Sequence, residues 1–129
     1  MYLAEGSTGP WVTCLQYGLY INNDNPGGID GIFGAGTKAA VQRFQETNQN
    51  YGVGYADGIV GDKTWSRMVA IIRSIQISLN SKYTRGVPQI GTDGYGGPET
   101  LNAIKAFQRA HGLYPNGIVS GETYNLILG

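Results

Sequence analysis

Few side chains in this sequence have the chemistry of a catalyst or a metal ligand. His111 is the only histidine and Cys14 the only cysteine among the 129 residues. A zinc site needs three or four His, Cys or carboxylate ligands that converge, and no short spacing joins these two residues. A Ser-His-Asp triad would need His111 as its base, but the sequence has no G-x-S-x-G motif. We expect His111 to lie near a helix end, as a surface residue or a partner of the helix dipole.

The carboxylates offer little more. Asp30 and Asp93 are at equivalent positions and could be the carboxyl pair of a glycoside hydrolase, but each precedes a glycine, which is typical of a tight turn. The stretch NNDNPGG at 22–28 resembles a calcium loop. An EF-hand counted from Asn22 would place Pro26 and Phe33 at its fifth and twelfth positions, where oxygen ligands are needed. We therefore expect neither a metal nor another cofactor.

The same turn motif occurs four times along the chain. It reads DGIFGAGT (30–37), DGIVGDKT (57–64), DGYGGPET (93–100) and NGIVSGET (116–123). Asp or Asn followed by Gly favours a turn, and the fifth residue is at a helix N-cap position. These caps are predicted at Gly34, Gly61, Gly97 and Ser120. The closing threonines are expected to reach back toward the caps, and Trp65 and Tyr124 to pack in the core against Val60 and Val119.

A larger repeat contains these turns. Seven of seventeen positions are identical between 29–45 and 92–108. We interpret the chain as two copies, the first repeat at 1–69 and the second at 70–129. Apolar spacing predicts three helices in each. No Gly or Pro interrupts 62–85, so the third helix of the first repeat is a candidate to run on into the first helix of the second. The predicted fold is all-α: two tandem three-helix modules with Gly-rich Asp-Gly turns and a possible shared central helix.

Three blocks together resemble a known family. EGSTGPWVTCLQYGL, IDGIFGAGTKAAVQRFQ and DGIVGDKTW are similar, in this order, to the type 1 peptidoglycan-binding domain, a three-helix module of bacterial and phage cell-wall hydrolases. The second repeat departs from the pattern at Gly96, Asn116 and Tyr124, which puts equal binding by the two copies in doubt. The resemblance implies non-covalent peptidoglycan binding without catalysis, and a covalently linked N-terminal catalytic domain such as that of an endolysin.

A glycan site is expected to combine a few aromatic rings with amides and carboxylates. We predict a groove in each repeat between the Asp-Gly turn and the first two helices. The four glutamines that follow core residues are expected to bond loop backbone rather than ligand. The ring of Phe33 is expected to be partly exposed, because its staple position holds Lys38. The predicted ligand-binding residues are Tyr20, Asp30, Phe33 and Tyr55 in the first repeat, and Tyr83, Asp93 and Tyr95 in the second.

Composition limits the other functions. Nine basic residues balance nine acidic ones, which argues against nucleic acid and anionic membranes as partners. The N-terminus has no signal-peptide pattern, so a location at the bacterial cell wall is expected to depend on export by another route or on release by lysis. The leading hypothesis is a non-catalytic module that anchors a wall-lytic enzyme to peptidoglycan. The alternatives are a protein–protein adhesion or assembly module and a self-sufficient wall hydrolase.

Overall fold

The computed structural model describes residues 2–82 and 84–129. Within them the chain forms five α-helices and one 3-10 helix, in the order α1 (Pro10–Ile21), α2 (Ala35–Thr47), η1 (Gln49–Tyr51), α3 (Asp62–Ser81), α4 (Pro98–Ala110) and α5 (Gly121–Leu128). The extended pairing within these residues is limited to two isolated bridges, Leu3 with Val60 and Thr8 with Ile32. The all-α prediction is confirmed.

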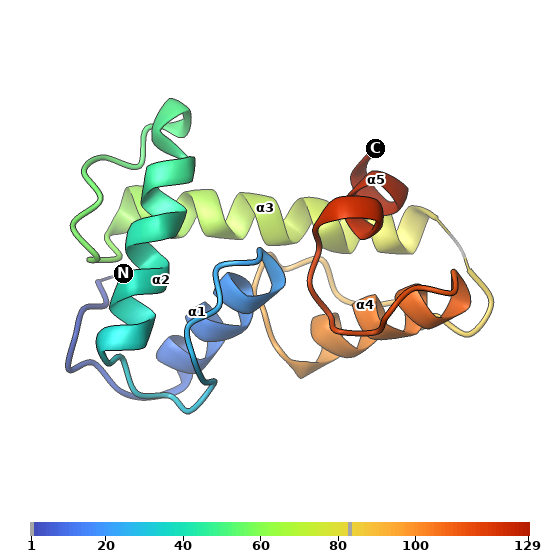
Figure 1. Ribbon diagram of the computed structural model, residues 1–129, viewed down its shortest axis with the longest axis horizontal. Helices are drawn as coiled ribbons and strands as arrows, with labels where there is room; N and C mark the ends of the chain where they lie inside the picture. The colour runs from blue at the N-terminus through green and yellow to red at the C-terminus, as the bar shows by residue number, and fades with distance from the viewer. Residues whose placement is uncertain (1, 83) are drawn as a thin grey trace.

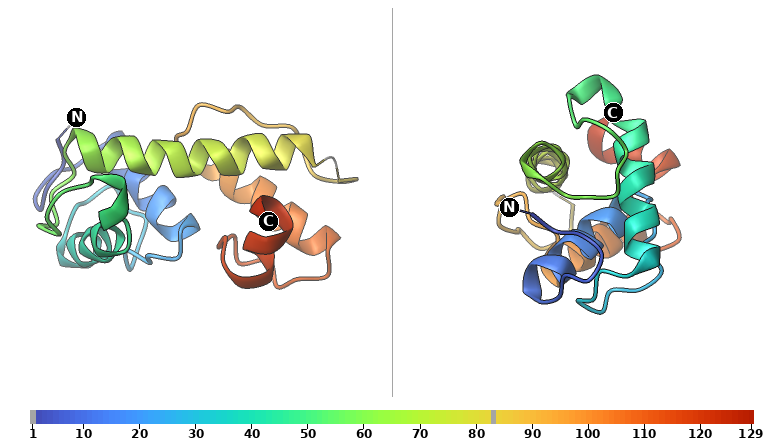
Figure 2. Two further views of the ribbon diagram at one scale, coloured as in Figure 1. Left: turned by 90° about the horizontal axis from the view of Figure 1, so that it is seen from above. Right: turned by 90° about the vertical axis from the view of Figure 1, so that its left-hand side faces the viewer.

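Helix α3 extends along the molecule and links its two ends (Figure 1). It has 20 residues, so the third helix of the first repeat does continue into the first helix of the second. Figure 2 shows α1 and α2 beside one half of α3, and α4 and α5 beside the other half. The helix stays intact because Met68, Ile72, Ile75 and Leu79 recur three and four residues apart and are all buried. The predicted boundary between the repeats, at 69/70, lies inside this helix and stays a prediction.

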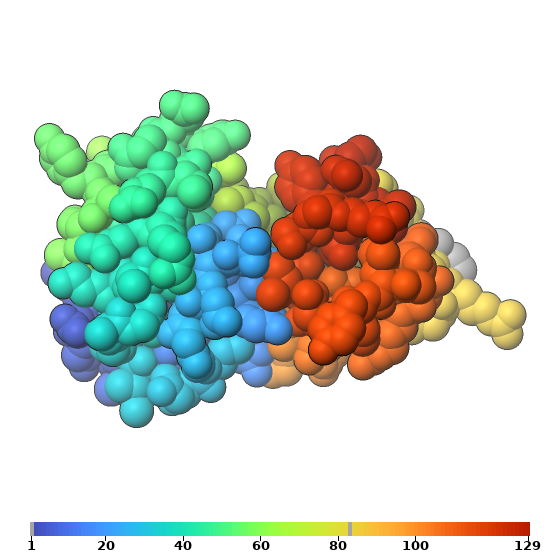
Figure 3. Space-filling view, in the orientation of Figure 1, coloured from blue at the N-terminus to red at the C-terminus, as the bar shows by residue number. Residues whose placement is uncertain are grey.

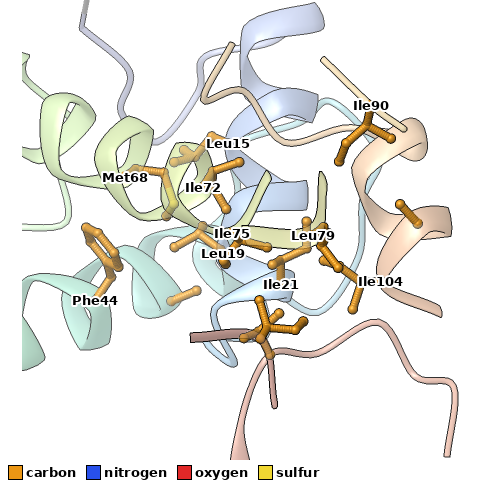
Figure 4. Packing of buried hydrophobic residues seen from close by; sticks show 14 of the residues in the cluster. Leu15, Leu19, Ile21, Phe44, Met68, Ile72, Ile75, Leu79, Ile90 and Ile104 are labelled. Carbon is orange, nitrogen blue, oxygen red and sulfur yellow. The ribbon is translucent and has the colours of Figure 1, made fainter. Parts of the chain in front are cut away.

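One hydrophobic core serves both halves. Leu15 and Leu19 of α1 lie against Ile72 and Ile75 of α3, and the same cluster continues to Ile104 of α4 (Figure 4). Figure 3 shows the atoms of α1 in contact with those of the second repeat. The backbone N–H of Val119 also donates a hydrogen bond to the carbonyl of Ile21 at 2.8 Å. The two repeats are therefore packed together rather than joined by a free linker.

The helices begin where the sequence predicts, but the threonines of the turn motif do not bond back to the helix caps. Gly34, Gly61, Gly97 and Ser120 are the N-caps, as predicted; the three glycines have no side chain to cap with, and Ser120 makes no side-chain cap hydrogen bond. The expected reach of the threonines back to the caps is wrong. Their hydroxyls accept hydrogen bonds from buried glutamines instead. The threonine hydroxyl thus becomes one of the acceptors around a buried amide nitrogen, which would be costly to leave unsatisfied.

Candidate functional site

Each turn is held by a glutamine from the helix before it. The side chain of Gln16 is 1 % exposed, and its Oε1 accepts hydrogen bonds from the N–H groups of Asp30 (3.0 Å) and Gly31 (2.9 Å). Its Nε2 lies within 3.1 Å of three acceptors: Asp30 Oδ1, Ile32 O and Thr37 Oγ1. An amide nitrogen has two hydrogens, so one of them is shared. This single side chain ties α1, the turn and α2 together.

The arrangement recurs at every turn. In each case Oε1 accepts from the turn glycine at 2.7–2.9 Å, and Nε2 donates to the Asx side chain, to the carbonyl two residues later and to the threonine. The other three glutamines are Gln45, Gln76 and Gln108, each 1 % exposed. The prediction that these glutamines bond loop backbone is confirmed.

The carboxylates of Asp30 and Asp93 accept hydrogen bonds from the glutamines and from the backbone of their turns. Asp30 accepts hydrogen bonds from the N–H of Ile32 (3.0 Å) and from Gln16 (3.0 Å). These two bonds, the backbone one first, hold the pKa of Asp30 below its ordinary value. Asp93 makes the same two contacts, with Tyr95 N–H at 2.9 Å and Gln76 at 3.2 Å. Asn116 takes this role in the fourth turn, which shows that the turn needs an oxygen acceptor but no charge.

The backbone after each turn glycine alternates between solvent and core. The first residue points outward: Ile32 is 56 % exposed, and Tyr95 is 40 % exposed. The second points inward, as at Phe33 and Val60. The expected exposure of Phe33 is therefore wrong. Its ring is 1 % exposed, because antiparallel bonds to Gly6 and Ser7 hold its backbone extended and direct the ring into the core.

The other predicted ligand residues are scattered. The Tyr20 hydroxyl donates to the carbonyl of Asn116 at 2.7 Å, so it ties the end of α1 to the last turn. Tyr55 is 90 % exposed and lines a hollow of about 350 Å³ beside Asp57. A smaller hollow of about 190 Å³ lies beside Asp30. Tyr83 lies outside the described residues.

Tyr95 belongs to an aromatic cluster that sequence reasoning missed. Its ring lies 5.2 Å from that of Trp11 and 6.2 Å from that of Trp65, and the two tryptophans are 5.8 Å apart, between centroids. Trp11 comes from the start of α1, Trp65 from the start of α3, and Tyr95 from the third turn. Because Asp93 accepts the N–H of Tyr95, it positions this ring. The structure thus places Tyr95, positioned by Asp93, in a ring cluster with two tryptophans.

A sequence signal for the cluster did exist in part. Trp11 follows Pro10 at the first turn of a helix whose buried face is Val12, Leu15 and Leu19, so it had to point away from that face. Trp65 was expected in the core and is only half-buried. Tyr124, also expected in the core, is 51 % exposed; α5 has only eight residues and buries Thr123 and Ile127 instead.

The side chains that could take part in catalysis or metal binding lie apart from one another in the described part of the chain. Within residues 2–82 and 84–129, no three His, Cys, Asp or Glu side chains come together to hold a metal ion. Burial raises the pKa of Cys14 to about 11. A hydrogen bond from the backbone of Gly96 lowers this pKa, and a smaller repulsion from Asp93 raises it. His111 is exposed, and its ring packs on that of Phe107 at 4.2 Å. No helix in the described part of the chain is long and apolar enough to cross a membrane.

Comparison with known proteins gives a consistent result. The model of the peptidoglycan binding domain family matches residues 8–68 and again residues 70–127. Among curated proteins, the chain is 32 % identical over 105 residues to the N-acetylmuramoyl-L-alanine amidase CwlL of Bacillus licheniformis. This alignment covers 74 % of this chain and 29 % of the amidase. It is 46 % identical over 68 residues to the zinc D-Ala-D-Ala carboxypeptidase of Streptomyces albus G. This alignment covers 51 % of this chain and 25 % of the carboxypeptidase.

A third relative is the spore cortex-lytic enzyme of Bacillus subtilis strain 168, with 39 % identity over 67 residues (52 % of this chain, 21 % of the enzyme). The chain thus spans less than a third of the length of each of these curated relatives. Comparison with solved structures found no significant match.

Proposed function

Because this chain belongs to the peptidoglycan-binding domain family, which occurs in cell-wall lytic enzymes, we propose that it anchors an attached hydrolase to the cell wall. The two family matches take up nearly the whole chain, so catalysis would come from a domain outside it. The curated relatives support this division, because the chain aligns with less than a third of each enzyme. A phage endolysin or a bacterial wall hydrolase, acting on the outer face of the cell after lysis or export, fits equally.

The observation that carries the binding site is the aromatic cluster of Trp11, Trp65 and Tyr95. Trp11 and Tyr95 are 46 % and 40 % exposed, although each also packs against the other rings. Sugar rings present C–H faces that pack on such surfaces, with nearby polar groups for orientation. The cluster includes residues from both repeats, so one glycan strand would contact both at once.

Weak sites would act together on a polymer. The hollows beside Asp30 and Tyr55 have volumes of about 190 and 350 Å³, and Tyr55 is the aromatic residue among those that line them, so each offers few rings for stacking. When two sites bind one strand, the second binding step is intramolecular, and overall affinity rises by about 10²-fold or more. We propose Tyr55 as a secondary contact, and Asp30 and Asp93 as residues that position the turns beside these sites. We do not propose Tyr20 and Phe33 as ligand contacts. The Tyr20 hydroxyl is bonded to Asn116 of the other repeat, and the Phe33 ring is buried.

A pull-down with purified peptidoglycan sacculi tests this site. The variants are Trp11→Ala, Tyr95→Ala and the double variant, with Tyr114→Ala as control because Tyr114 is 81 % exposed and is not among the rings of the cluster. We expect the double variant to lose about tenfold or more in retention, since two stacking contacts disappear, while the control binds as the parent does. Equal retention by the folded double variant would reject the aromatic site. Failure of the parent chain to bind sacculi would instead favour an adhesion or assembly module.

A further inference from the structure

A hollow of about 550 Å³ lies between α2, α3 and α5, away from the aromatic cluster. In Figure 3 it is seen as the notch between the green atoms at the end of α2 and the red atoms of α5, with α3 behind it. Its walls come from both repeats and from the end of α1. They carry polar groups, among them Asn22, Arg67, Ser74 and Tyr124.

Arg67 is held in place at this hollow. Its guanidinium lies over the ring of Tyr51, with 3.5 Å between Cζ and the ring centroid. Its Nε donates to Asn48 Oδ1 at 2.8 Å, and Asn48 is itself buried and bonded to the carbonyl of Phe44 at 2.8 Å. Arg67 and Tyr51 also line a second hollow, of about 440 Å³, together with Asp62 and Lys63; among the described residues, no acidic one lines the larger hollow. A guanidinium fixed on two sides loses little freedom when it binds a ligand.

This cation has no carboxylate partner in the described part of the chain. The ion pair found there joins Lys38 to Glu5, and Arg67 is the charged residue among those that line the larger hollow. Arginine binds carboxylates through two parallel N–H bonds, which are among the stronger hydrogen bonds in proteins. A half-buried, pre-positioned guanidinium beside a hollow is therefore suited to an anionic group from outside the chain.

We propose that this hollow binds the peptide stem of peptidoglycan, with a stem carboxylate held by Arg67. The inference rests on the proposed function and names the second component of the same polymer. A stem peptide has free carboxylates and amides, which match the guanidinium and the amide and hydroxyl groups of Asn22, Ser74 and Tyr124. A sugar ring is a poorer match, because the Tyr51 face is already covered by Arg67. The aromatic cluster would then read the glycan, and this hollow the peptide.

Calorimetric titration with a synthetic stem peptide tests the proposal. The probes are the peptide with free carboxylates and the same peptide with every carboxyl converted to an amide. We expect the free acid to bind and the amide to bind about tenfold or more weakly, because a charge-assisted bond is roughly twice as strong as a neutral one. Equal binding of the two peptides would overturn the proposal. So would binding of glycerol phosphate oligomers in preference to the peptide.

Two variants locate the site. Arg67→Gln is expected to lose the preference for the free acid, whereas Arg109→Gln, with the same loss of charge at an exposed position of α4, keeps it. Ser74→Glu leaves the contacts of Arg67 with Asn48 and Tyr51 in place but adds a competing carboxylate to the hollow. It should weaken acid binding by about tenfold even if Arg67→Gln folds poorly. Acid binding unchanged in Ser74→Glu, or in a folded Arg67→Gln, would contradict the assignment.

Sacculus binding separates this inference from the proposed function. If the parent chain binds sacculi but no stem peptide, the peptide site is wrong and wall binding stands. If the parent binds neither, the proposed function fails as well. Loss of peptide binding in Ser74→Glu with sacculus retention still dependent on Trp11 would support two separate sites.

Discussion

Gly96 of the third turn touches Gly18 of α1 backbone to backbone: a Cβ built on Gly96 would lie 2.7 Å from the Gly18 nitrogen. The corresponding position in the first turn is Phe33, whose ring fills the core. In the second repeat α1 occupies the neighbouring space, so a side chain has no room. The replacement of the aromatic by glycine is thus explained by the packing of the two repeats.

Gly96→Ala should loosen this junction. The added methyl group would meet the Gly18 nitrogen and the Cys14 carbonyl, which cannot move without shifting α1. Overpacking of this kind costs about 1–3 kcal/mol, and thermal unfolding would show it as a lower Tm. Gly28→Ala is the matched control, because its Cβ would meet nothing within 4 Å and the residue lies outside the helices and their caps. A Tm equal to that of the control would mean that the two repeats do not pack as described.

Gln108→Met should lower the free energy of unfolding by about 2–3 kcal/mol. The thioether keeps the volume but leaves the buried N–H of Gly117 and the hydroxyl of Thr123 without their partner, and an unsatisfied buried group costs about 1–3 kcal/mol. Urea denaturation measures the change. The exposed Gln89 supplies the control variant Gln89→Met, for which little change is expected. A loss of less than about 0.5 kcal/mol at Gln108 would contradict the role of the glutamine.

Phe33→Leu should reduce stability without reducing wall binding. The ring is fully buried, and this large-to-small core replacement leaves a cavity that costs about 1–2 kcal/mol. At a temperature where the variant is folded, we expect sacculus retention equal to that of the parent. Weaker retention by the folded variant would restore Phe33 as a ligand contact.

Asp30 should make stability depend on acid pH. Its pKa is lowered in the folded chain by the Ile32 N–H and by Gln16, so its contribution is complete above the unfolded pKa of about 3.9 and is lost as pH falls through the lower folded pKa. Asp30→Asn keeps an oxygen acceptor, as Asn116 does in the fourth turn. Because Asn stands in for the protonated carboxyl, urea denaturation followed by circular dichroism should find this variant less stable than the parent at pH 7, and the difference should disappear as pH falls through the lowered folded pKa. A stability difference that stays the same from neutral to acid pH would show that the Asp30 charge is not coupled to folding.

Cys14 should react slowly with thiol reagents while the chain is folded. Its pKa of about 11, against an ordinary value of 9.0, reduces the thiolate at pH 8 by roughly a hundredfold. We therefore expect labelling at that pH to be about a hundredfold slower than in denaturant. Comparable rates in the two states would mean that the Cys14 environment is open.

The sequence by itself determined the local elements. Asx-Gly pairs, small caps and three-to-four spacing placed the four turns and the starts of the helices, and the uninterrupted run after Gly61 indicated the long α3. These features depend on neighbours along the chain, which sequence patterns record directly. Asp30 could be assigned to its turn for the same reason, because it belongs to the Asx-Gly pair. Gln16 lies 14 residues earlier in the chain, and its place beside the apolar face of its helix indicated a bond to loop backbone.

Only the tertiary structure decided which rings face solvent and which residues meet. Phe33 is buried because the N-terminal segment pairs with its backbone, and Tyr20 is bonded to a residue 96 positions away. Trp11, Trp65 and Tyr95 form one surface because α1 of the first repeat packs against the second repeat. Such contacts depend on how helices pack across the whole core. Local spacing carries no record of that packing, since the same amphipathic helices can pack in more than one way.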